Sequence, residues 1–385
     1  MKKVILFIIV NCQFSIVNCQ NNLVQNPSFE FYTSCPPSGG INMIDNASPW
    51  FNPTMSDPVY FNACYTGPTW LGVPLNSWGF QNARTGVAYA AIASYADIDE
   101  RVYIEAPLTD TLIKGKKYCV EFYVSLADVC KVASNNIGVC FTKDSLINYS
   151  ISYLYLLPGI PQIEEKEIIT DTTNWVLISG NFVANGGERF MTIGNFRNNA
   201  NTDTLTVGGI SSEANYYLDD VSVMRMPEIK AGYDTTINEG DSAKLYTTTD
   251  ATWNVSYNWQ PATGLSCANC PNPTASPTET TVYKVTVSDS LGCPNTDSVT
   301  VTVIQKLVIP NVITPNGDGV NDKFEIKGLT EGATLQIFNR WGELVFYAAN
   351  YPNSWDAANV PDGVYYYMLT LPNKEKRNGF VEVVK

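Results

Sequence analysis

The chain between residues 310 and 322 reads Pro310-Asn311-Val312-Ile313-Thr314-Pro315-Asn316-Gly317-Asp318-Gly319-Val320-Asn321-Asp322. Asn and Asp side chains around two glycines are typical of a turn that caps its own backbone, although the same oxygens could hold calcium. Two later stretches follow: residues 337–346 contain Arg340-Trp341-Gly342, which reads as a hairpin turn, and residues 361–367 end in a strand at Tyr365-Tyr366-Tyr367. We expect Arg340 and Trp341 to pack on Trp355 and on the strand Tyr365-Tyr366-Tyr367. The order predicts a small all-β domain at residues 305–385.

In this order the three stretches resemble the gliding motility-associated C-terminal domain, which is the sorting module of type IX secretion. The resemblance covers about a fifth of the chain. It implies that the type IX secretion machinery is a partner of the protein. It also implies that the protein is exported to the outer cell surface or the medium.

The composition limits the remaining fold and function classes. A chain of 385 residues predicts two to four domains, and 16% charged residues with 26 Gly, 22 Pro and 22 Tyr favour β-sandwiches. The net charge of −13 and the lack of a basic stripe argue against nucleic acid as a partner, because phosphate binding needs clustered Lys and Arg. The absence of histidine excludes Ser-His-Asp and Cys-His catalysis and His-based zinc sites. Two-carboxylate glycoside hydrolysis is the main enzymatic option that remains.

The amino terminus predicts a signal peptide at residues 1–19. Lys2 and Lys3 precede an apolar run from Val4 to Val10 that is too short to span a bilayer, and Cys19 before Gln20 fits a cleavage site. A lipoprotein attached at Cys19 or Cys12 is the alternative. No later run is apolar enough for a transmembrane segment.

Eight cysteines follow the signal peptide, and an even number in an exported chain favours disulfide bonds. Cys267-Ala-Asn-Cys270 could indicate a redox or zinc motif, but it has no second Cys pair and is followed by Pro271. We therefore predict a local structural disulfide between Cys267 and Cys270.

Composition shifts place boundaries near Met226-Pro227 and near Ile304-Gln305. The middle segment, residues 227–304, alternates apolar and polar side chains and resembles a PKD-like or immunoglobulin-like spacer, with Trp259 and Tyr283 as core residues. Residues 20–226 open on Asn22–Glu30 and close on Tyr217–Val223. These two ends resemble the galactose-binding-like jelly roll of carbohydrate-binding modules. The fold class is thus predicted as all-β, with three consecutive β-sandwich modules.

The jelly-roll resemblance implies a structural calcium held by Glu30 and Asp219, with Asp220 adjacent. The alternative is a polar, hydrogen-bonded corner.

Glycan binding needs exposed aromatic rings and amide or carboxylate groups for the hydroxyls. Residues 50–95 are rich in both, and Pro and Gly mark this stretch as loops. The alternative is that most of these rings fill the core. The predicted ligand-binding residues are Trp70, Trp78, Tyr65, Asn76 and Gln81.

No motif places two acids across a sugar cleft, so we predict no catalytic residues and no enzyme activity. The acids available for hydrolysis are Asp97, Asp99, Glu100, Glu105, Glu164, Glu165 and Glu167. The leading function is an exported, non-catalytic surface protein that binds glycan or extracellular polymer for adhesion or nutrient capture. The alternatives are a structural component of the surface or gliding apparatus with protein partners only, and a two-carboxylate polysaccharide-degrading enzyme.

Overall fold

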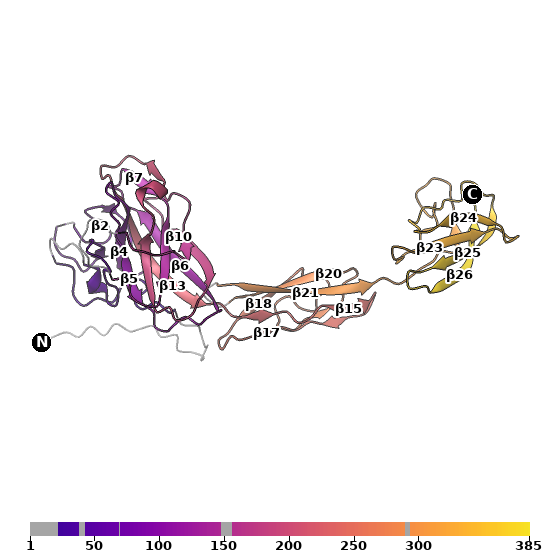
Figure 1. Ribbon diagram of the computed structural model, residues 1–385, viewed down its shortest axis with the longest axis horizontal. Coiled ribbons are helices and arrows are strands. Elements are labelled where there is room, and N and C mark those ends of the chain that lie inside the picture. The colour runs from indigo at the N-terminus through magenta and orange to yellow at the C-terminus, as the bar shows by residue number, and fades with distance from the viewer. Residues whose placement is uncertain (1–21, 38–42, 69, 148–155, 289–292) are drawn as a thin grey trace. The chain divides into compact units, whose positions relative to one another are not determined.

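A computed structural model describes residues 22–385 except 38–42, 69, 148–155 and 289–292. The predicted signal peptide lies outside the described residues. The prediction of an all-β protein with several sandwich modules is confirmed (Figure 1). Over the described ranges the helices are two short 3-10 turns, η1 (Ile44–Ala47) and η2 (Asn199–Asn201). None of the helices described is long and apolar enough to cross a membrane.

The chain forms two compact units. Among the described residues, the first consists of those from 22 to 228 together with those in 249–256 and 287–295. The second consists of residues 229–248, 257–286 and 296–385.

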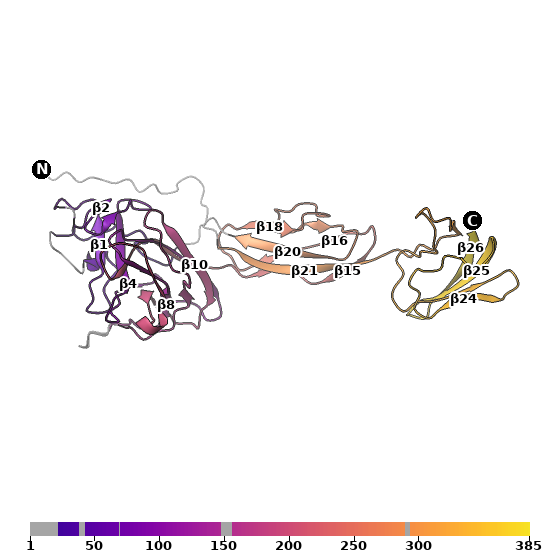
Figure 2. The same ribbon diagram turned by 90° about the horizontal axis from the view of Figure 1, so that it is seen from above.

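The first unit is a jelly-roll sandwich of two antiparallel sheets (Figures 1 and 2). The five-stranded sheet has the order β1 (Val59–Asn62), β4 (Ala88–Tyr95), β13 (Ala214–Arg225), β6 (Lys117–Leu126), β10 (Val176–Val183). The four-stranded sheet has the order β5 (Ile104–Pro107), β11 (Phe190–Asn195), β8 (Ile137–Thr142), β9 (Ile163–Glu164). Two short pairs add β2 (Leu75–Asn76) with β3 (Gly79–Phe80), and β7 (Val132–Ser134) with β12 (Thr204–Thr206).

Burial along the strands shows how the sandwich is built. The edge strand β10 alternates, with Ile178 and Phe182 in the core and Leu177 and Val183 exposed. The central strand β4 is buried on both faces. One face of a central strand contacts the opposite sheet, so the other face of β4 must be covered by loops.

Strands between residues 229 and 304 form a four-stranded sheet with the order β15 (Thr235–Asn238), β21 (Asn295–Ile304), β20 (Thr281–Ser288), β18 (Ser256–Gln260). Two short pairs accompany it: β14 (Ile229–Lys230) with β17 (Thr248–Thr249), and β16 (Ala243–Lys244) with β19 (Thr274–Ala275). Trp259 and Tyr283 are fully buried, as predicted, and the Trp259 Nε1 donates to the Cys270 carbonyl at 3.0 Å.

Residues 307–385 form one five-stranded sheet with the order β22 (Val312–Ile313), β26 (Lys376–Val383), β25 (Gly363–Thr370), β23 (Thr334–Phe338), β24 (Leu344–Ala348). One face of the sheet covers a separate hydrophobic core, which includes Phe324, Leu335, Tyr351 and Trp355. Trp355 meets Phe324 and Tyr365 edge to face, at centroid distances of 6.1 and 5.9 Å. This core contains only residues of the carboxy-terminal domain.

Candidate functional site

The short hairpin β2–β3 lies on the outer face of the five-stranded sheet and is held there by two buried amides. Asn76 donates to the Tyr89 hydroxyl and accepts from the Tyr217 hydroxyl, both at 2.9 Å. Gln81 donates to the Ser125 hydroxyl at 2.6 Å. Both amides were predicted to contact ligand, but in the structure they fix the hairpin to the sheet.

The hairpin and the preceding residue Trp70 leave three apolar side chains in solvent. Leu75 and Phe80 are cross-strand partners, so they share a face, and Phe80 is 53% exposed. Trp70 is 54% exposed, and its carbonyl accepts from the Ser77 amide and hydroxyl at the hairpin turn. We refer to Trp70, Leu75 and Phe80 as the hairpin ridge. The predicted Tyr65 is half-buried and packs against the core.

Trp78 lies in the turn of this hairpin and connects the ridge to a pocket. Its ring packs edge to face on Phe61 at 5.4 Å and lies 6.3 Å from the Tyr217 ring, so it is half-buried. The pocket has a volume of about 180 Å³. We call it the acidic pocket, and it is lined by Asp57, Val59, Trp78, Ala93, Ala96, Glu100, Val102, Glu213 and Asn215.

The three carboxylates of the acidic pocket influence one another. Burial raises the pKa of Glu100, and the negative charges of Glu213 and Asp57 raise it further. Burial also raises the pKa of Asp57. Asn215 is almost fully buried, and its amide donates to Glu213 Oε2 at 3.2 Å. The pocket therefore offers several hydrogen-bond acceptors beside an aromatic ring.

The sequence alone did not identify Asp57, Glu213 or Asn215. Asp57 precedes β1, Glu100 precedes β5 and Glu213 precedes β13, and only the fold brings these three segments together. The other acids considered for hydrolysis do not line this pocket. Glu164 pairs with Arg197 at 2.7 Å, and Glu105 is buried and accepts from the Thr192 hydroxyl at 2.8 Å.

The two ends of the jelly roll meet at a polar corner, where the charges of Glu30, Asp219 and Asp220 interact. A β-bulge in β13 between Asp219 and Ser222 turns Asp220 towards the opening segment, where the Ser28 hydroxyl donates to it at 2.5 Å. Arg84 also pairs with Asp220. Burial, and then the Asp220 charge, raise the pKa of Asp219 to about 8.

Protein donors already engage the carboxylates of this corner. Glu30 Oε1 accepts from the amides of Val87 and Ala88 at 2.8 and 3.0 Å. Asp219 Oδ2 accepts from the Arg84 amide at 2.8 Å. Within the described ranges, no group of three or more Asp, Glu, Cys or His side chains converges as a metal ion requires. No contact among the described residues requires calcium at Glu30, Asp219 and Asp220. The calcium site therefore stays a prediction from the resemblance.

A calcium-removal experiment separates the two interpretations of this corner. Because the hydrogen bonds satisfy the carboxylates without a cation, we expect the melting temperature in excess EGTA to equal that in millimolar calcium. Differential scanning calorimetry of the purified protein measures it. A melting temperature several degrees higher in calcium would establish the metal site, since only a ligand of the folded state stabilises it in this way.

Six of the eight cysteines form disulfides: Cys35–Cys64, Cys119–Cys293 and Cys267–Cys270. The predicted local bridge in the middle segment is therefore present. Cys130 and Cys140 are buried thiols, and burial raises the pKa of each to about 11. A thiol with such a pKa is not a nucleophile at neutral pH.

The Asn316–Asp322 loop forms the predicted self-capping turn. Asp322 Oδ1 accepts from the amides of Asn316 and Gly317 at 3.1 and 2.8 Å, and Oδ2 accepts from the Gly319 amide at 2.8 Å. These amides lower the pKa of Asp322. The turn thus uses the oxygens that calcium would otherwise need.

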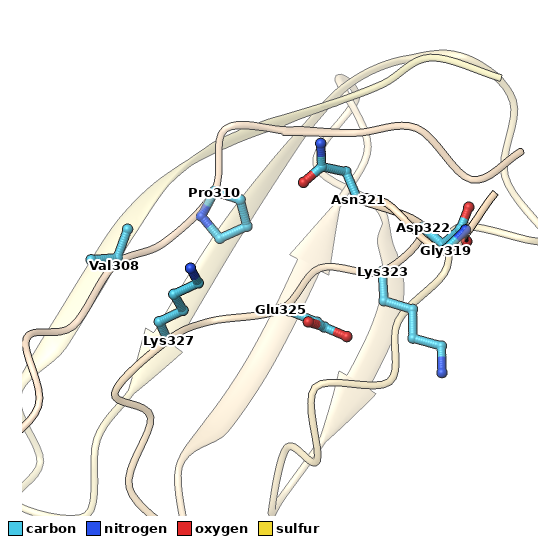
Figure 3. A pocket seen from close by; sticks show the side chains of 8 residues that line it. All are labelled: Val308, Pro310, Gly319, Asn321, Asp322, Lys323, Glu325 and Lys327. Atoms are coloured by element: carbon cyan, nitrogen blue, oxygen red, sulfur yellow. Dashed lines mark hydrogen bonds between the residues drawn. The ribbon is translucent and has the colours of Figure 1, made fainter. Parts of the chain in front are cut away.

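Beside this turn lies an open groove of about 380 Å³ (Figure 3). Figure 3 shows Asn321 and Lys327 extending towards Pro310, and Glu325 and Lys323 extending away from it. The lining mixes both signs of charge and does not favour one class of ligand.

The structure corrects one detail of the carboxy-terminal prediction. Arg340 and Trp341 do form a hairpin turn, in which the Glu343 amide donates to the Asn339 side chain at 3.0 Å. The packing predicted for Trp341 is wrong, because this ring is 83% exposed. Phe324, Phe346 and Tyr365 surround Trp355 instead.

Comparison with known proteins identifies one part of the chain. Residues 307–383 match the CHU_C type IX secretion signal domain. No curated protein matches the chain.

Several solved structures are similar to parts of the chain. The CBM22-1 xylan-binding domain of Paenibacillus barcinonensis Xyn10C is 15% identical, covers 54% of this chain and 96% of its own, and has a TM-score of 0.29. The amino-terminal cellulose-binding domain of Cellulomonas fimi β-1,4-glucanase C is 13% identical, covers 44% and 88%, and has a TM-score of 0.22. The two immunoglobulin domains of DIP-gamma are 11% identical, cover 41% and 96%, and have a TM-score of 0.24.

The family match agrees with the sheet and the core described for residues 307–385. Residues 307–383 thus carry a type IX secretion signal, which directs the protein to the cell surface or the extracellular space.

Proposed function

We propose that the first unit binds glycan through the hairpin ridge and the acidic pocket, and that the exported protein serves adhesion or nutrient capture without catalysis. The observation that carries this proposal is that Trp70 and Phe80 are half-exposed, while Trp78, in the turn between β2 and β3, lines a pocket of hydrogen-bond acceptors. Sugar rings stack on exposed aromatic faces, and their hydroxyls donate to carboxylate and amide oxygens.

The dimensions of the site favour binding over hydrolysis. Ligand clefts usually measure about 300–1,000 Å³, so the acidic pocket takes only a small part of a polymer. The rest of the polysaccharide would lie along the hairpin ridge, which is an open surface. Weak binding at each site would become firm attachment when many copies act together on the cell surface.

A glycan array with the purified protein tests the proposal. We expect retention of at least one class of polysaccharide, and no release of shorter sugars when the bound polymer is incubated with the protein. An array without any hit would favour the alternative of a structural component with protein partners only. Release of sugars that stops when Glu100 or Glu213 is replaced by Gln would favour the enzyme.

Substitutions on the hairpin distinguish binding from packing. Trp70→Ala with Phe80→Ala removes the exposed rings, so we expect glycan retention to be lost while the melting temperature hardly changes. Trp78→Ala should also weaken retention, but it removes packing on Phe61 and should cost about 2–4 kcal/mol of unfolding free energy. Affinity electrophoresis and denaturant unfolding measure the two effects.

Phe31 provides a matched control, because it is exposed in the same unit but lies outside the ridge and the pocket. Phe31→Ala should change neither retention nor stability. Equal loss of retention in the Phe31 and the Trp70/Phe80 variants would contradict a specific role of the ridge.

A further inference from the structure

The carboxy-terminal sheet buries one face and exposes the other. In β25, Tyr365 and Leu369 point into the core, and Leu335 and Ile337 of β23 pack with them. Successive side chains of a strand point to opposite faces. The residues between these core positions therefore form the outer face of the sheet.

The strand register aligns four apolar side chains across this outer face. Phe380 of β26 pairs with Tyr366 of β25, Tyr366 pairs with Phe338 of β23, and Phe338 pairs with Leu344 of β24. Val364 and Tyr347 lie on the same face in the neighbouring rows, as the pairs Val364↔Glu382 and Gln336↔Tyr347 show. We refer to these six residues as the sorting face: Phe338, Leu344, Tyr347, Val364, Tyr366 and Phe380.

Five of these six side chains are exposed to solvent, and Phe338 is half-buried. Tyr366 is 52% exposed and Phe380 49% exposed, and Leu344, Tyr347 and Val364 are exposed to a similar degree. Charged residues lie at the two ends of β26, at Lys376 and Glu382, whereas the row through Tyr366 carries no charge. An apolar centre with a polar rim is the usual composition of a protein interface.

We infer that the sorting face is the docking surface for a protein of the type IX export machinery, which would present a complementary apolar, uncharged surface. All six residues lie within the segment that matches the secretion signal domain. As a secretion signal, this segment must be recognised for export. None of the six residues of the sorting face belongs to the hydrophobic core of this domain.

The area of the sorting face indicates whether its partner is the export machinery or a second copy of this protein. Half-exposed aromatic and aliphatic side chains contribute about 100 Å² each, so the five exposed members together with the half-buried Phe338 offer roughly 500–600 Å². A stable interface takes about 800 Å² from each partner. The face is too small for a permanent dimer, and it fits the transient contact that an export substrate must release.

The inference is independent of glycan binding, because the hairpin ridge belongs to the other unit. Failure of one proposal would leave the other intact. Glycan retention by the exported material is therefore measured in the same experiment.

Charge placed in the middle of the row tests the inference. The full-length Tyr366→Glu, Phe380→Glu variant is produced in a bacterium with a type IX system, and the extracellular and cell-associated amounts are compared by immunoblot. We expect the extracellular amount to fall about tenfold or more, as for loss of a central interface contact. Tyr233→Glu, which alters an exposed tyrosine outside residues 307–383, is the matched control and should leave export unchanged.

A second variant separates recognition from folding. Tyr366→Thr with Phe380→Thr keeps side chains that suit a strand and removes the rings, so it should fold with a melting temperature near that of the wild type and still lose export. Wild-type export by this folded variant would overturn the inference. So would loss of glycan retention with normal export, because the face would then bind sugar.

A photo-reactive amino acid at position 366 identifies the occupant. We expect a covalent adduct that mass spectrometry identifies as this chain joined to a component of the export machinery, and no such adduct from position 233. An adduct that contains two copies of this chain would overturn the inference in favour of self-association.

Discussion

Deletion of residues 307–385 is expected to abolish the appearance of the protein outside the cell. The deleted segment contains the whole secretion signal match and the whole carboxy-terminal core. Since that core includes no residue of the jelly roll, the jelly roll should still fold, and the shortened protein should accumulate inside the cell envelope. Fractionation and immunoblotting measure the loss, and a melting curve of the retained protein shows whether it is folded.

A single core substitution gives the same result by another route. Trp355→Ala removes a buried ring that Phe324, Phe346 and Tyr365 surround, and should cost about 3–5 kcal/mol of unfolding free energy. For a domain of this size such a loss approaches its total stability. Export should then fail because the signal is unfolded. Normal export of the deletion variant would show that the address lies elsewhere in the chain.

The outcome at residues 310–367 shows which features of a fold can be inferred from sequence. Gly317 and Gly319 mark a turn, and the Asn and Asp side chains around them cap it as expected, because such bonds span only a few residues. The neighbours of Trp341 depend instead on contacts distant in sequence. Its type suggested burial, but its place at the tip of a hairpin exposes it.

The candidate binding site shows the same limit. The sequence indicated loops rich in aromatic rings at residues 50–95, and within this stretch the structure has the hairpin β2–β3, with Trp70 exposed and Trp78 lining the acidic pocket. The direction in which Asn76 and Gln81 point depends on Tyr89, Tyr217 and Ser125, which lie on distant strands. The acidic pocket combines three loops, so no local pattern could have revealed it.

The cysteines give the clearest case of a long-range feature. A separation of three residues made the Cys267–Cys270 bridge predictable, but the Cys119–Cys293 bridge spans 174 residues and has no local signal. It joins β6 to the segment 287–295, which belongs to the first unit although it follows the middle strands in sequence. Met224 and Met226 pack around it, so both sulfur atoms lie in a small buried cluster.

Replacement of Cys119 and Cys293 by Ala should destabilise the first unit by roughly 5 kcal/mol, because the bridge closes a long loop in the unfolded chain. Loss of the short Cys267–Cys270 loop should cost only roughly 2 kcal/mol. Denaturant unfolding of the two double variants measures this difference, and mass spectrometry under non-reducing conditions confirms which bridge is absent.

The ion pairs of Lys116 and Arg225 in the same unit determine how much of the stability lost with the Cys119–Cys293 bridge can be recovered. Lys116 contacts Glu228 and Asp250 at 2.8 and 3.1 Å, and Arg225 contacts Asp250 at 3.4 Å. These pairs are partly exposed, so they contribute little and weaken with salt. They should not replace the covalent bond, and the deficit of the Cys119/Cys293 variant should persist at low and high ionic strength. Equal losses in the two double variants would contradict the loop-closure argument and assign the stabilisation to local packing around the sulfur atoms.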